Sequence, residues 1–75
     1  KTKIKYYLRK SGKVKLEIFN ILGQKIRTLV NQFQNSNTYI IYWDGQNSQG
    51  IETASGIYIY RLKTNNRIES GKMVL

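Results

Sequence analysis

The stretch 42–62, YWDGQNSQGIETASGIYIYRL, is the part of this 75-residue chain that most directly predicts its fold. It links two runs of β-branched and aromatic residues, 38–43 and 56–63, and such residues are enriched in strands. The segment between the runs is rich in Gly, Asn and Ser, and it opens with Asp44-Gly45. An Asp can bond its own downstream backbone and Gly accepts positive φ, so this segment suits a chain reversal. The pattern predicts that the two runs form a β-hairpin.

Two further strands are predicted near the N-terminus, where apolar residues alternate with mostly basic ones. This period of two is typical of a strand with one buried face. A turn at Ser11-Gly12 separates the two segments, so they also are predicted to pair as a hairpin. The apolar positions are Ile4, Tyr6 and Leu8 in the first strand and Val14, Leu16 and Ile18 in the second.

The remaining segments complete an all-β pattern. Residues 19–24 are interpreted as a short turn with its apolar residues tucked in, and 31–37 as a polar loop. Residues 25–30 lack strict alternation, which predicts a strand with a bulge or, less favoured, a helical turn. A turn at 64–66 leads to a last strand within 67–75. Six or seven short strands and no helical window predict one antiparallel β-sandwich domain over residues 1–75.

The charge balance limits the possible partners. Thirteen Lys and Arg face four acidic residues, which gives a formal charge of +9, and there is no His or Cys. Such a charge disfavours self-association and points to nucleic acid, an anionic membrane surface, or an acidic protein or polysaccharide. The alternative is a lysine-rich solvated surface without a dedicated partner. No apolar run approaches the roughly 20 residues that span a bilayer.

The residues required for catalysis or metal binding are missing or scattered. Without His or Cys, nucleophilic and zinc mechanisms lose their usual base, nucleophile and ligands. Glu17, Glu52 and Glu69 lie on separate segments, so no pair of carboxylates is indicated. The acidic loop 44–52 lacks the spacing of a calcium loop, and an Asx-turn is the favoured role of Asp44. We therefore predict no enzyme activity, no cofactor and no metal.

One local pattern suggests nucleic acid. Tyr7, beside Lys3, Lys5 and Arg9, combines a stacking ring with phosphate-binding cations, as in proteins that bind single strands. No recognised nucleic-acid motif accompanies it, so this function is disfavoured.

Four motifs, in order along almost the whole chain, carry a family resemblance: residues 16–29 (LEIFNILGQKIRTL), 43–45 (WDG), 54–62 (ASGIYIYRL) and 72–75 (KMVL). Together they resemble the type IX secretion system C-terminal sorting domain and its close relative, the immunoglobulin-like domain of flagellar hook-capping proteins. The resemblance implies a seven-stranded immunoglobulin-like β-sandwich at the C-terminal end of a longer exported protein. It also implies a non-enzymatic role at the cell surface or in the medium.

Two functions follow from the resemblance. The first is sorting, in which the outer-membrane secretion machinery recognises the domain and exports a larger cargo, and a surface peptidase then removes the domain in many members. The alternative is a structural or assembly module of an extracellular fibre, appendage or multidomain surface protein, in contact with neighbouring subunits or domains. The alternative predicts that the purified domain forms oligomers that are lost when Ile59 becomes charged.

Two sets of residues are assigned from this reasoning. Trp43 is interpreted as a core anchor, with Tyr58, Tyr60 and Leu62 facing the core, whereas Ile57, Ile59 and Arg61 occupy a partly exposed face. The fold motif is predicted to comprise Gly23, Trp43, Asp44, Gly45, Gly56, Tyr58, Tyr60 and Leu62. The recognition or contact surface is predicted to comprise Ile57, Ile59, Arg61, Lys72, Met73, Val74 and Leu75.

Overall fold

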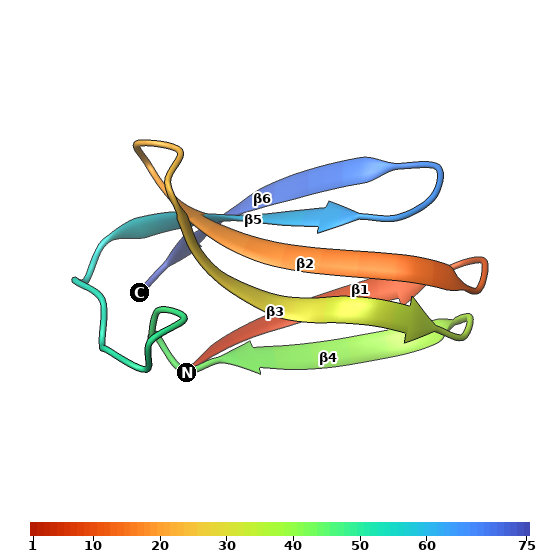
Figure 1. Ribbon diagram of the computed structural model, residues 1–75, viewed down its shortest axis with the longest axis horizontal. Coiled ribbons are helices and arrows are strands. Elements are labelled where there is room, and N and C mark those ends of the chain that lie inside the picture. The colour runs from red at the N-terminus through yellow and green to blue at the C-terminus, as the bar shows by residue number, and fades with distance from the viewer.

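Six β-strands and no helix make up the computed structural model, which describes all residues 1–75 (Figure 1). The predicted all-β antiparallel sandwich is confirmed, with six strands where about seven were expected. No helical segment is present that could cross a membrane. The strands are β1 (Thr2–Leu8), β2 (Gly12–Asn20), β3 (Lys25–Gln34), β4 (Asn37–Trp43), β5 (Ile57–Lys63) and β6 (Ile68–Val74).

The strands form a two-stranded sheet, β1-β4, and a four-stranded sheet, β3-β2-β5-β6. Both hairpins predicted from the sequence are therefore wrong. β4 and β5 lie in different sheets, and so do β1 and β2, because β1 pairs with β4 while β2 pairs with β3 and β5. Alternation reveals which face of a strand is buried. It does not distinguish two neighbours in one sheet from two strands that face each other across the core.

The core lies between the two sheets, and the alternation predicted most of it. All six apolar positions of the first two strands are buried, from Ile4 to Ile18. Trp43 has no exposed surface and packs its ring edge against Tyr58, with 5.1 Å between the ring centroids. Its indole N–H donates to the carbonyl of Gln46 at 2.9 Å, so its one polar atom is satisfied. Leu62 and Met73 extend the core across β5 and β6.

The bulge predicted in the third strand is confirmed, whereas the residue at which that strand was predicted to end is wrong. The β2–β3 register shifts between Leu16 and Glu17 and again between Ile18 and Phe19, and β3 continues to Gln34. The expected loop 31–37 is strand in its first half because an edge strand needs few apolar residues. Buried Gln34 accepts a hydrogen bond from the Tyr6 hydroxyl, and burial raises the pKa of that hydroxyl.

The turn between β2 and β3 also differs from its prediction. Phe19 and Asn20 belong to β2, and the apolar side chains of Ile21 and Leu22 are 70% and 79% exposed, not tucked in. The Asn20 side-chain oxygen accepts from the backbone N–H groups of Leu22 and Gln24, both at 3.0 Å. Gly23 completes the turn with a φ of 82°. The turn is thus held by hydrogen bonds, which leaves its apolar residues in solvent.

Candidate contact surface on the four-stranded sheet

Six apolar side chains lie on the outer face of the four-stranded sheet; Phe33 and Ile68 stand apart, and the other four lie side by side on β2, β5 and β6. Phe19 of β2 is opposite Ile59 of β5, and Ile57 of β5 is opposite Val74 of β6. Ile57 is 46% exposed and Val74 is 75% exposed, while Phe19 and Ile59 are half-buried. We call these four residues the apolar strip. Its position confirms the predicted orientation of β5, with Ile57 and Ile59 outward and Tyr58 and Leu62 inward.

The exposed apolar surface continues into the β2–β3 turn. Asn20 is paired with Tyr58, so the turn that carries Ile21 and Leu22 follows directly beyond the Ile57 end of the strip. In Figure 1 this turn and the start of β5 lie at the same end of the molecule. Contiguous apolar surface of this kind on a soluble domain marks a contact site for another protein more often than isolated exposed residues do.

Cations flank the strip on both sides. Lys25 of β3 is opposite Phe19, and Lys72 of β6 is opposite Ile59; both lysines are exposed. The Arg61 guanidinium lies over the Phe19 ring, 4.7 Å from its centroid. A partner matches this face if it has an apolar centre and either an acidic margin or added salt that screens the lysines.

A buried carboxylate fixes Arg61 in that position. Glu17 is only 3% exposed although it lies on the outer face, and its Oε1 accepts from Nη2 of Arg61 at 3.0 Å. Its Oε2 is 3.6 Å from Nζ of Lys15 and 3.8 Å from Nζ of Lys25. The Arg61 Nε is buried without a hydrogen-bond partner, although the side chain as a whole is 43% exposed.

The environment of Glu17 keeps it ionised. Burial alone would raise the pKa of the Glu17 carboxyl. The Arg61 hydrogen bond and the charges of Lys15, Arg61 and Lys25 outweigh that effect, so the pKa is lowered. Glu17 is thus a structural anion under the contact surface.

The predicted glycines and Asp44 organise the end of the sandwich next to Trp43. Asp44 accepts from the Gln46 backbone N–H at 3.0 Å, which confirms the Asx-turn, and from Nη1 of Arg27 at 3.0 Å. Gly45 has a φ of 82°, and a Cβ there would lie 3.3 Å from the Leu75 side chain. Gly56 exchanges two backbone hydrogen bonds with Leu75, at 2.8 and 3.1 Å.

Two residues of the predicted contact surface lie elsewhere. Met73 is a core residue, 8% exposed, because β6 alternates and directs Lys72 and Val74 outward. Leu75 is half-buried against Gly45. The prediction treated 72–75 as a continuous surface and so ignored the period of two. Ile57, Ile59, Arg61, Lys72 and Val74 do share the outer face.

Sequence reasoning missed Phe19 and Glu17 as parts of this surface. Both lie on the outward side of β2, the side that also carries Lys13 and Lys15. Extending the alternation of the second strand by one residue, to position 19, would have found Phe19. The assignment of 19–24 to a turn concealed it.

The outer face of the other sheet holds the pattern that suggested nucleic acid. Tyr7 is 65% exposed, and the register places Ile40 opposite Lys5 and Tyr42 opposite Lys3. Ile40 and Tyr42 are 48% and 59% exposed, so this face too carries apolar side chains beside lysines. It lies on the opposite side of the sandwich from the apolar strip.

Comparison with known proteins identifies the fold family. The family model described as the FlgD Ig-like domain matches residues 1–67. The match covers β1 to β5 and ends at the turn before β6, and it makes the sandwich immunoglobulin-like, as predicted. It supports the hook-capping half of the resemblance and does not address type IX sorting. No curated protein and no solved structure matches the chain significantly.

Proposed function

The chain belongs to the FlgD Ig-like domain family, and on that basis we propose that it is a non-enzymatic assembly module that contacts neighbouring subunits or domains of an extracellular structure. The observation that carries the proposal is the apolar strip with its flanking lysines. The match to the FlgD Ig-like domain family also favours a location outside the cell or in an appendage. Within this proposal the domain acts by presenting a rigid surface.

The geometry of the strip supports a contact role. Its residues project from three hydrogen-bonded strands, so binding immobilises little backbone and costs little conformational entropy. Phe19 is held further by Arg61, which is itself held by Glu17. An apolar centre with charged margins is the usual anatomy of a protein interface.

The placement of the acidic residues supports the absence of catalysis. Glu17, Asp44 and Glu69 each lie within ion-pair distance of an arginine: Arg61 and Arg27 at 3.0 Å, and Arg67 at 3.7 Å. The lowered pKa of the Glu17 carboxyl makes that group a poor general base. Such pairs leave few free groups for acid–base chemistry.

We expect the domain to associate through the strip and to do so more strongly as salt is added. The +9 charge opposes self-association, and salt screens that repulsion while leaving apolar contact intact. Ile59→Glu should abolish association because it places a carboxylate at the centre of the strip. Sedimentation velocity across a range of protein and salt concentrations measures the effect.

Ile40→Glu is the matched control for that experiment, since Ile40 is an exposed isoleucine on the outer face of the other sheet. It makes the same change in net charge and should leave association unchanged. A wild-type domain that stays monomeric at every salt concentration, or equal loss in both variants, would contradict self-contact through the strip.

The type IX sorting function stays a prediction, and one experiment separates it from assembly. A sorting signal must work when moved to a foreign cargo, whereas an assembly module works only beside its natural partners. Residues 1–75 would be fused to a fluorescent protein with a periplasmic export signal in a host that has the type IX system. Cargo on the cell surface would support sorting, and cargo retained in the periplasm would support assembly.

A further inference from the structure

The two-stranded sheet is open at both edges, and one of them is the outer edge of β1. β1 is bonded to β4 alone, and no backbone hydrogen bond outside the sheets involves Thr2–Leu8. Every second residue of β1 therefore directs its N–H and C=O groups away from β4 with no protein acceptor or donor. A strand edge of this length is a ready template for an additional strand.

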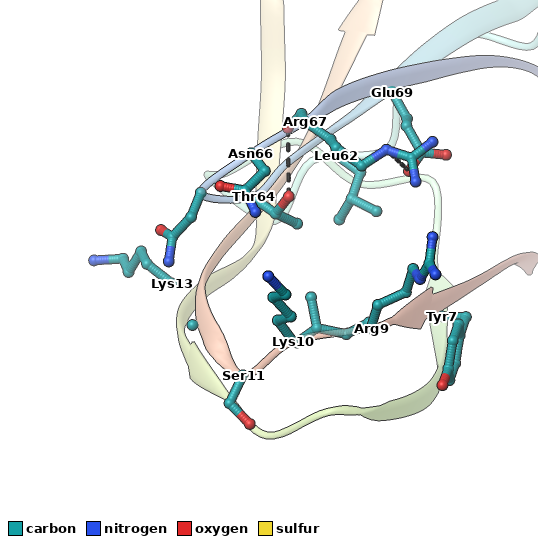
Figure 2. Close-up of a pocket in the computed structure, with 13 residues that line it drawn as sticks. Tyr7, Arg9, Lys10, Ser11, Lys13, Leu62, Thr64, Asn66, Arg67 and Glu69 are labelled. Atoms are coloured by element: carbon teal, nitrogen blue, oxygen red, sulfur yellow. Dashed lines mark hydrogen bonds and ion pairs between the residues drawn. The ribbon is translucent and has the colours of Figure 1, made fainter.

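The open edge of β1 lies on the side of the β5–β6 hairpin. β4 lies on the β3 side, where Asp44 binds Arg27 and the N–H of Ser48 donates to the Ile26 carbonyl at 3.1 Å. The far end of β1 and the loop after it instead line a cavity of about 570 Å³ with residues of the β5–β6 hairpin. Figure 2 shows Leu62 and Arg67 on one side of this cavity and Arg9 and Lys10 on the other.

On this side of the core, one aromatic side chain of β5 keeps part of its surface exposed. Tyr60 shares the inner face of β5 with Tyr58 and Leu62, which are 6% and 5% exposed, yet Tyr60 is only half-buried. Its β6 neighbour is Gly71, where a Cβ would lie 2.3 Å from the Tyr60 ring. The Tyr60 ring thus packs directly against the backbone of Gly71. We call the space between the β1 edge and Tyr60, Leu62 and Gly71 the edge slot.

The charges around the edge slot define what fits it. Lys3 and Lys5 project outward from β1, and most ionisable side chains of the cavity are cationic. Its one acid, Glu69, is 3.7 Å from Arg67 and so already paired. A second copy would bring its own lysines opposite these, which is unfavourable for directly opposed strands. The cations that line the cavity are Arg9, Lys10, Lys13 and Arg67.

We propose that the edge slot takes an extended segment of a second protein, in which acidic residues alternate with apolar ones, as a third strand beside β1. The apolar side chains of this segment cover the exposed part of Tyr60, and its carboxylates face Lys3 and Lys5. The segment's backbone pairs with the free groups of β1. This interaction goes beyond the proposed contact through the apolar strip, because it uses a different sheet.

The test uses a short synthetic peptide that alternates valine with glutamate, and it follows amide hydrogen exchange of the whole 75-residue chain by NMR. We expect the peptide to protect amides of Thr2–Leu8 and to shift the Tyr60 ring resonances. A peptide of the same composition with valines and glutamates in separate blocks should not bind. N-methylation of every second peptide residue should abolish binding when the methylated amides are those that face β1. Methylation of the other set should leave binding intact, because those amides point away from β1.

Two charge reversals localise the binding. Lys10→Glu should weaken the peptide's affinity about tenfold, since Lys10 lines the cavity. Lys72→Glu makes the same change in net charge on the four-stranded sheet and should change affinity less than about twofold. The Ile59→Glu variant should bind the peptide as the wild type does. Loss of peptide binding at the edge slot can therefore be distinguished from loss of association through the apolar strip.

Several results would overturn the proposal. Binding without protection of β1, or equal binding by the blocked peptide, would show that no strand is added. Protection of β1 that rises with protein concentration in the absence of peptide would assign the edge to a second copy. If β1 is already protected in a longer natural form of the protein, the edge belongs to another segment of the same polypeptide.

Discussion

Trp43→Ala is expected to lower the free energy of unfolding by about 3–5 kcal/mol, which is the usual cost of removing a large buried aromatic side chain. Trp43 has no exposed surface and is the largest of the fully buried side chains. Small domains are stable by only about 5–15 kcal/mol in total, so a large share of the stability would be lost. Urea unfolding followed by far-UV circular dichroism measures the change without relying on tryptophan fluorescence.

Tyr42→Ala is the matched control for Trp43. It removes the adjacent aromatic residue, which is 59% exposed on the outer face of the small sheet. Its expected cost is about 1 kcal/mol or less. Equal urea midpoints for the two variants would contradict the anchoring role of Trp43. Trp43→Phe should fall between them, because it keeps a ring against Tyr58 but leaves the Gln46 carbonyl without its indole donor.

Glu17→Gln is expected to cost about 1–2 kcal/mol, since it removes the anion shared by Lys15, Lys25 and Arg61. The cost is below that of a fully buried pair because all three cations are partly exposed and can regain water. Added salt should reduce the loss by screening the remaining cations. Glu69→Gln is the control, as its pair with Arg67 is exposed on both sides, and its effect should be within about 0.5 kcal/mol.

The same carboxylate predicts a pH dependence. The pKa of Glu17 in the folded chain is lowered from its ordinary value of 4.5, so the unfolded chain takes up the proton first as the pH falls. The stabilisation by Glu17 is therefore fully present above about pH 4.5 and is lost as the pH falls through the lower, folded-state pKa. Glu17→Gln should flatten the stability curve in that acidic range. Parallel curves for the variant and the wild type down to about pH 2 would contradict this role.

The burial of side chains was more predictable from the sequence than the pairing of strands. Ile4, Tyr6 and Leu8 are buried as expected, because a period of two records which side of a strand meets the core. The partner of that strand is β4, far along the chain, and nothing in the alternation specifies it. Proximity in sequence favoured hairpins at Ser11-Gly12 and at the 44–56 segment. In both places the chain crosses from one sheet to the other.

The candidate contact surface was also predictable only in part: the direction of its side chains was predictable, but their neighbours were not. The outward position of Ile57 and Ile59 follows from the alternation of β5, and the structure shows it. The neighbours of Ile59 depend on cross-strand register, which brings Phe19 and Lys72 beside it. Those two registers, between β2 and β5 and between β5 and β6, are visible only in three dimensions. The sequence therefore identified individual residues of the surface. The complete set of residues that form the surface could be identified only from the structure.

Consecutive strands such as β1–β2 and β4–β5 lie in different sheets, and this arrangement affects the rate of folding. Thr2 pairs with Trp43, and Lys15 pairs with Lys63, so the partners that complete both sheets come late in the chain. Closing such long loops costs entropy before any contact compensates it, which slows folding. During vectorial synthesis, β1 must wait for β4, and β2 must wait for β5. We expect the chain to acquire its shape only after most of it has emerged from the ribosome.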